Sequence, residues 1–285
     1  MILPPTIHQR LEELRGSRIV LICVSLILFI AVLAILGPML SPYSLETVAF
    51  DNSFVAPTFS DGQLFGTDDL GRDLFVRTME GTRMTMLVAV VATVVSLLIG
   101  VSYGAIAGYV GGKTDALMMR VVDALYAMPF IFFVILLMVV FGRDLILIFI
   151  AIGAINWLDT ARIVRGQTLS LKQRAFVDAA RLSGLSPAGI IIRHIGPNLF
   201  SVIIVYITLT IPQVILFESF LSFLGLGVQE PQTSLGALVS DGVDRMERAP
   251  WMLLIPAAFL ALVLFCFNFL GDGLRDLLDP KSDIR

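Results

Sequence analysis

Long apolar stretches separated by polar segments dominate the hydrophobic pattern of this 285-residue chain. A helix needs roughly 20 mainly apolar residues to cross a bilayer, so these stretches are candidates for membrane-spanning helices. The shortest of them is expected to continue as helix through Val164 into polar sequence. The pattern predicts an all-α, polytopic membrane protein with six transmembrane helices: Ile19–Leu36, Met86–Tyr109, Val121–Phe141, Leu145–Leu158, Leu199–Leu224 and Trp251–Leu270.

The polar segments divide the chain into four parts. Residues 1–17 form a polar tail, and residues 18–84 hold the first span and a loop rich in Pro, Gly and Asp. The end of that loop, Arg72–Met84, is expected to form an amphipathic helix lying at the membrane interface. Residues 85–271 hold the remaining spans as one core domain that includes a polar loop at 172–197, and residues 272–285 form a second tail.

Prolines interrupt three of the expected spans, at Pro129, Pro212 and Pro256. Membrane helices tolerate interior proline when neighbouring groups satisfy the freed carbonyls, and the proline produces a kink. Kinked helices would suit a bundle that rearranges, and ordinary packing explains them about as well.

Composition supports the membrane class. The chain is 57% hydrophobic and only 15% charged, far from the average of soluble proteins. A net charge of −3 gives no electrostatic case for nucleic acid. Both cysteines lie in apolar runs and the chain has only two histidines, so we expect neither a disulfide framework nor a metal site, and no cofactor bound to this chain.

The distribution of Lys and Arg predicts the orientation. An even number of spans places both termini on one side of the membrane, and 14 of the 20 basic residues lie in the segments on that side. Cytoplasmic segments of membrane proteins carry an excess of Lys and Arg. Both tails and the 172–197 loop are therefore predicted to be cytoplasmic.

The 172–197 loop reads as two short helices joined at a glycine. Ala175–Ser183 favours a helix, and Gly184 follows where a C-terminal cap with positive φ is wanted. Ser186 suits an N-cap with Pro187 at the first position of a second helix, which is expected to run through Ile190 to Arg193. Pro197 is expected to separate this loop from the next apolar run.

A family resemblance rests on this loop. The chain has Asp178-Ala179-Ala180, three residues, Gly184, nine residues, and then His194-Ile195-Gly196-Pro197. The spacing matches the loop Glu-Ala-Ala, three residues, Gly, nine residues, Ile-x-Leu-Pro of the membrane subunits of bacterial ATP-driven importers. Asp replaces Glu here, and His and Gly replace Ile and Leu. Further stretches resemble peptide permeases: Phe65–Asp73, Trp157–Leu171, Phe220–Pro231 and Gly271–Pro280.

From about residue 18 to its end the chain resembles C-type inner-membrane permease subunits of bacterial oligopeptide and dipeptide ABC importers. The resemblance implies a multi-pass protein of the bacterial inner membrane that translocates peptides. It implies four kinds of partner: a second, related permease subunit, two ATPase subunits that carry ATP and Mg, an external substrate-binding protein, and membrane lipid. The 172–197 loop would be the coupling loop, in which the Asp178 carboxylate accepts a bond from a basic residue of the ATPase. Ala179, Ala180 and Gly184 would let its short helix fit a cleft of that ATPase.

Two sets of residues inside the spans are candidates for other roles. Gly100, Gly104 and Gly108 recur at every fourth position, a pattern typical of close helix packing in lipid. Glu218 is a carboxylate at membrane depth, where it should face the bundle or a water-filled cavity. It could line the translocation path and meet the cationic end of a peptide, or bond to a neighbouring helix; the sequence favours neither.

Other function classes find less support. Gly108–Thr114 resembles a phosphate-binding loop, but Ala107 stands where the first glycine is required and a membrane helix precedes it. A secondary transporter would show inverted repeats, which we do not find. A membrane enzyme would need clustered catalytic groups, and the nearest set, Asp68, Asp69 and Asp73, has no His or Cys in its loop. The cargo could also be another small solute, such as a nickel complex.

Overall fold

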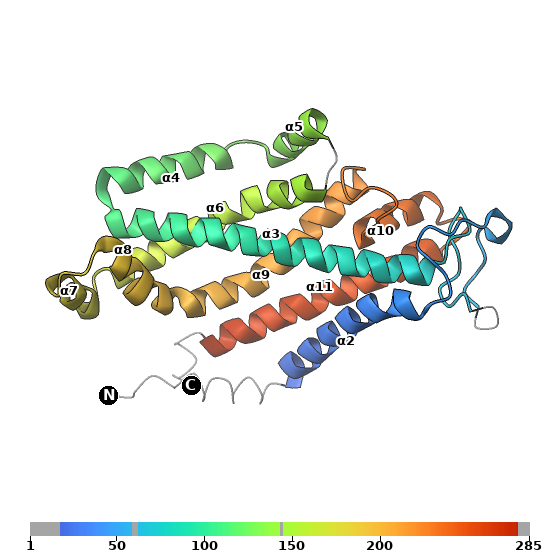
Figure 1. The fold of residues 1–285 in the computed structure, drawn as a ribbon, viewed down its shortest axis with the longest axis horizontal. Coiled ribbons are helices and arrows are strands. Elements are labelled where there is room, and N and C mark those ends of the chain that lie inside the picture. Colours follow the sequence, from blue (N-terminus) through green and yellow to red (C-terminus); the bar gives the residue numbers. More distant parts are fainter. Residues whose placement is uncertain (1–17, 59–61, 143–144, 279–285) are drawn as a thin grey trace.

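The computed structural model describes residues 18–58, 62–142 and 145–278, and these residues form an all-α bundle, as predicted (Figure 1). The predicted tail at residues 1–17 lies outside the described part. The helices of the described part, in chain order, are α2 (Arg18–Leu40), the 3₁₀ turn η1 (Phe50–Asn52), α3 (Leu74–Val110), α4 (Gly112–Tyr126), α5 (Phe130–Phe141), α6 (Leu145–Leu171), α7 (Ala175–Leu182), α8 (Pro187–Ile190), the π-helix η2 (Ile191–Ile195), α9 (Gly196–Phe223), α10 (Leu235–Asp244) and α11 (Trp251–Leu278).

Within these residues, four stretches of helix are long and apolar enough to cross a membrane. They are Arg18–Leu40, Leu74–Val110, Pro187–Phe223 and Trp251–Asp276, while the apolar part of α5 is shorter. Helix α6 carries the fourth predicted span and continues through Leu171, as the sequence indicates. The total of six spans stays a prediction.

The interfacial helix expected at the end of the external loop is instead the first part of α3. The segment expected at Arg72–Met84 does not form a separate helix at the membrane surface; from Leu74 onward it is continuous with the second span. Asp73 caps this helix, because its Oδ1 accepts a hydrogen bond from the Val76 N–H at 2.8 Å. Most of the polar side chains in this segment are buried against protein, among them Arg77, Thr78 and Thr82, while Arg83 is exposed. A Cβ at Gly81 would lie 3.1–3.2 Å from Ser234 and Leu235, where α10 begins.

The third predicted span, Val121–Phe141, is wrong as one continuous helix. It is divided between α4 and α5 by a break at residues 127–129. Proline donates no backbone N–H and disfavours helical backbone in the residue before it. Pro129 therefore ends the first helix rather than kinking a single one, whereas Pro212 and Pro256 remain inside α9 and α11.

The expected interruption at Pro197 is also wrong. Helix α8, the π-helix η2 and α9 follow one another without a gap, and Pro197 lies in the first turn of α9. The Gly196 N–H bonds the Ile191 carbonyl five residues back, which is the wider π spacing. Proline is tolerated here because the first turn of a helix needs no N–H donor from that position.

The core runs along the middle of the bundle, where α3 lies between its neighbours (Figure 1). Helices α2, α3, α6, α9 and α11 all contribute buried apolar side chains to it: Ile30, Val88, Ile152, Ile215 and Val263. Many large apolar side chains are instead exposed on outer faces, such as Phe29 and Leu254. An apolar outer surface of this kind suits contact with lipid.

Candidate functional site

Helices α7 and α8 project from one end of the bundle, away from α10 (Figure 1). The local sequence explains their shape. Gly184 adopts φ +78°, and the Ser186 side chain accepts a hydrogen bond from the Gly189 N–H at 3.2 Å with Pro187 at the first helical position. The predicted glycine turn and N-cap are confirmed. We call residues 172–197 the α7–α8 loop.

One face of the α7–α8 loop is fixed to the bundle. Val177, Ala180, Ile190 and Ile195 are buried in a cluster that also contains Tyr109 of α3 and Val164 of α6. This contact is apolar and close-packed, so a displacement of the loop must move the ends of those helices as well.

The opposite face of the loop is open. The Leu182 side chain is 91% exposed and Ile192 is 72% exposed, which is unusual for apolar residues on a polar loop. Asp178 is exposed and pairs with Arg181 at 3.0 Å. The two alanines of the motif divide between the faces: Ala179 is exposed, while Ala180 packs against the bundle.

Gly100, Gly104 and Gly108 lie against the backbone of α6. A Cβ at Gly100 would come within 2.5 Å of Thr160 Cβ, and one at Gly108 within 2.8 Å of the Arg165 carbonyl oxygen. Gly104 faces the Ala161 carbonyl in the same way. The absence of side chains therefore lets α3 and α6 approach closely.

Glu218 of α9 is 1% exposed and joins three helices. One carboxylate oxygen accepts from the Ser222 hydroxyl at 2.7 Å and the other from the Thr85 hydroxyl of α3 at 3.3 Å. Ser222 lies 3.0 Å from Ser234, the N-cap of α10. Glu218 thus bonds a neighbouring helix, and its role in transport stays a prediction.

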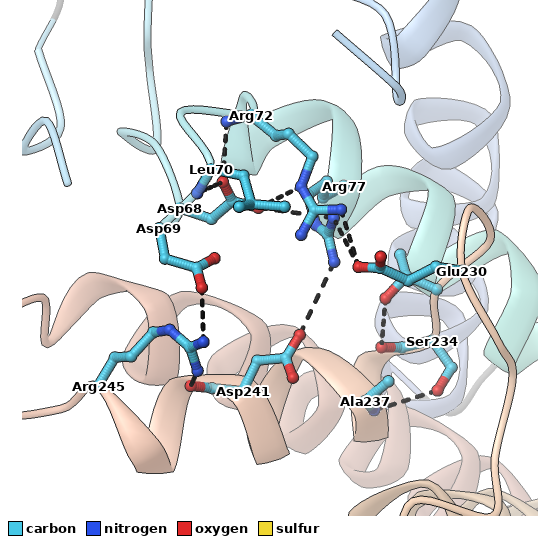
Figure 2. A network of polar contacts seen from close by, with 11 residues as sticks. Asp68, Asp69, Leu70, Arg72, Arg77, Glu230, Ser234, Ala237, Asp241 and Arg245 are labelled. Carbon is cyan, nitrogen blue, oxygen red and sulfur yellow. Dashed lines mark hydrogen bonds and ion pairs between the residues drawn. The ribbon is translucent and has the colours of Figure 1, made fainter. Parts of the chain in front are cut away.

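A network of ion pairs holds the other end of the bundle together (Figure 2). Arg72 bonds Asp68 at 2.7 Å and reaches Glu230, on the segment before α10, at 2.8 Å. The bond from Arg72 lowers the pKa of the Glu230 carboxyl below its usual value. Arg245, which follows α10, pairs with Asp69 at 2.5 Å, so the segments before and after α10 each form an ion pair with the loop before α3.

Arg77 lies at the centre of this network with its side chain 3% exposed. Its guanidinium lies 3.5 Å from Asp68, 3.7 Å from Glu230 and 3.8 Å from Asp241 (Figure 2). The aspartates weighed as catalytic groups thus have structural partners: Asp68 and Asp69 are in ion pairs and Asp73 caps α3.

A cavity of about 830 Å³ lies beside the α4–α5 break. Helices α6 and α9 form its other walls, and its lining is mainly apolar and aromatic. Pockets of about 300–1,000 Å³ with an apolar lining and few polar groups are typical of ligand sites. Three polar side chains line it, Asn156, Asp159 and Gln213, together with the Tyr126 phenol; Glu218 does not.

Comparison with known proteins assigns the chain to a family. Residues 100–284 match the model of the inner membrane component of binding-protein-dependent transport systems. Residues 8–57 match the N-terminal transmembrane domain of oligopeptide transport permease C. The chain belongs to this family of transport-system inner membrane components.

Individual relatives agree with the family models. The chain is 55% identical over 254 residues to the oligopeptide transport system permease protein OppC of Haemophilus influenzae, covering 89% of this chain and 82% of the relative. It is 52% identical over 256 residues to OppC of Escherichia coli K12, covering 90% and 85%. It is 43% identical over 271 residues to the dipeptide transport system permease protein DppC of Bacillus subtilis, covering 95% and 84%. The expected resemblance to C-type peptide permeases is confirmed.

The α7–α8 loop and the cavity both lie within the part that matches the inner membrane component model. Reasoning from the sequence identified the loop of this permease-family protein but missed the cavity and the ion-pair network. The one local indication of the cavity was Pro129, which was expected to kink a helix and instead marks the break beside which the cavity lies. The partners in the network are up to 176 residues apart, as with Asp69 and Arg245, so no local pattern reveals them.

Proposed function

We propose that this chain is the transmembrane permease subunit of an ATP-driven ABC importer that carries peptides across the bacterial inner membrane. The observation that carries the proposal is its similarity, over most of its length, to oligopeptide and dipeptide permease proteins. The chain itself would hold neither ATP nor Mg. ATP hydrolysis would take place on two separate ATPase subunits.

The α7–α8 loop supports docking of such an ATPase. It offers exposed apolar side chains, Leu182 and Ile192, and the exposed Asp178 carboxylate. Buried apolar anchors surrounded by polar groups are typical of protein interfaces. Its inner face is packed against α3 and α6, so movement of a docked ATPase would pass to the spans as a rigid-body displacement.

A second permease subunit would complete the path. Helix α5 exposes Leu136 and Val139, and α9 exposes Leu216 and Phe220, near the cavity. These faces would meet a related subunit, so that the path runs between the two chains. An external substrate-binding protein would deliver the peptide at the α10 end, and both termini would lie in the cytoplasm with the α7–α8 loop.

The direct test is uptake of labelled tri-alanine into vesicles that contain the complete transporter. We expect uptake that needs ATP and is blocked by vanadate, and we expect the purified chain alone to hydrolyse no ATP. Uptake driven by an ion gradient and insensitive to vanadate would contradict the proposal in favour of a secondary transporter. ATP-driven uptake of a nickel complex in place of peptides would contradict the peptide assignment alone.

A further inference from the structure

The cavity beside the α4–α5 break is lined by a carboxyl group, Asp159, directly after the fourth predicted span. Asp159 lies 14 residues after the start of α6, about 20 Å along the helix, and its side chain lines the cavity. A carboxylate within a membrane bundle is costly unless it is paired or faces water. Asp159 is not enclosed by hydroxyl groups of neighbouring helices in the way that Glu218 is.

The partners of Asp159 are weak for a carboxylate in this setting. Its one hydrogen bond with the described residues comes from the neutral phenol of Tyr126, at 2.5 Å. The nearby cation, Arg162, is already engaged: its guanidinium bonds Asp123 at 2.7 Å and stacks 4.3 Å from the centre of the Tyr126 ring. Counted by formal charge, the cluster of two carboxyl groups and one guanidinium has one more acidic than basic group.

The rest of the lining fits a short, mainly apolar chain. The cavity walls include Phe133, Trp157 and Phe220, and Gln213 adds an amide. The cavity lies beside residues 127–129, where α4 has ended and α5 has not yet begun. A ligand with one cationic end and variable side chains would match both the excess negative charge and the apolar walls.

We infer that this cavity is a subsite of the translocation path in which the Asp159 carboxylate binds the α-ammonium group of a peptide. Tyr126 holds the carboxylate in place, and the aromatic walls accept the side chains without selecting among them. The inference deepens the proposed function, on which it rests, by naming the group of the substrate that the membrane subunit recognises.

Peptide binding tests this assignment. The complete transporter is purified through a tag on this chain, placed in lipid nanodiscs and measured without the external binding protein. The probes are labelled tri-alanine with a free amino terminus and the same peptide N-acetylated. The free peptide should bind about tenfold more tightly or better, because a bond between two charged groups is lost on acetylation.

Asp159→Asn should abolish that preference while leaving binding of the acetylated peptide unchanged. Asparagine has the same shape and can still accept from Tyr126, so folding should be preserved; Asp159→Glu should keep part of the preference. Glu247→Gln removes an exposed carboxylate outside the cavity and should change nothing. Equal binding of the two peptides by the unmodified transporter, or an undiminished preference in Asp159→Asn, overturns the inference.

A second measurement identifies what occupies the cavity. A photo-crosslinking amino acid at Gln213, which lines the cavity, should attach to tri-alanine when light is applied in its presence. Attachment only to another membrane subunit, with or without peptide, would show that a partner side chain fills this space and would overturn the subsite. If vanadate-sensitive peptide uptake persists in that case, the proposed function stands and only the subsite fails.

Discussion

Single residues in this bundle carry polar contacts that link helices far apart in the sequence. Glu218 bonds Thr85 across 133 residues and Ser222 within its own helix. The Thr85 hydroxyl also accepts a hydrogen bond from the Leu235 N–H, at 3.1 Å. Removal of the carboxylate would take away the acceptor of two buried hydroxyl groups, those of Thr85 and Ser222, and each unsatisfied group costs about 1–3 kcal/mol.

Glu218→Leu should therefore lower the amount of assembled, heat-resistant complex, and Glu218→Gln should do so less because its amide still accepts one bond. Thermal unfolding of the purified complex measures the effect. The ranking of peptides in uptake should stay the same in whatever complex remains. Phe200→Leu, at an exposed position of the same helix outside the cavity, serves as the control for stability. A changed peptide ranking with normal stability would place Glu218 in the path instead.

Gly104 is a position with no room for a side chain, because a Cβ there would meet the backbone of α6. Gly104→Ala should force α3 and α6 apart, at a cost of about 1–3 kcal/mol, the usual range for overpacking. Gly166→Ala is the matched control, because no atom lies within 4 Å of a Cβ at that position. Thermal unfolding should show a lower midpoint for the first variant only. Equal midpoints would mean that the contact between the two helices is looser than described.

At the scale of elements, the α7–α8 loop combines a rigid inner contact with an open outer face. Gly184 adopts φ +78°, and no atom lies within 4 Å of a Cβ built at this position. The space beside the turn is therefore open to a partner. A branched side chain there meets backbone strain and also occupies that space. The pair between Asp178 and Arg181 is on the surface and adds only about 0–1 kcal/mol to folding.

Variants of this loop should therefore have graded effects. Gly184→Leu should abolish ATP-dependent uptake. Asp178→Ala should weaken ATPase association by roughly tenfold or more, the loss expected for one bond to a charged group, and only reduce transport. Pull-down of the ATPase and peptide uptake from the same membranes measure both effects.

Membrane abundance of both loop variants should be normal, because the substitutions lie outside the bundle core. Gly166→Leu controls for an added leucine on an exposed surface of the same end. Full transport by Gly184→Leu at normal abundance would mean that the α7–α8 loop does not couple ATP hydrolysis to the spans.

At the scale of the whole molecule, the bundle has two unlike ends. One end carries the projecting α7–α8 loop, and the other carries α10 and the ion-pair network (Figures 1 and 2). Fixed contacts at both ends and a cavity between them are compatible with a bundle whose path opens alternately to each side. The excess of Lys and Arg predicts that the α7–α8 end is cytoplasmic.

Thiol labelling in intact cells tests that orientation. Gln232→Cys, beside α10, should react with an impermeant reagent added outside. Lys172→Cys, beside α7, should react only after the membrane is opened. The native Cys23 and Cys266 are buried and should give little background. The reverse pattern would invert the orientation and remove the α7–α8 loop from the side on which ATP is available.

The sequence by itself determined the all-α class, most of the apolar runs, the family and the shape of the α7–α8 loop. These features depend on interactions within a few residues. Hydrophobic runs predict the spans. Gly184 determines the turn of the loop, and Ser186 with Pro187 determines the start of its second helix, through their own backbone preferences. The same local logic failed at Pro197, where a π-helix carries the chain past a proline that was expected to interrupt it.

Only the tertiary structure decided which polar residues act together. Arg72 and Glu230 are 158 residues apart, and Thr85 and Glu218 are 133 apart, so no spacing in the chain could pair them. Glu218 and Asp159 are both carboxylates on apolar helices, yet one is enclosed by hydroxyl groups and the other faces a cavity. Their different surroundings follow from how the neighbouring helices pack in three dimensions.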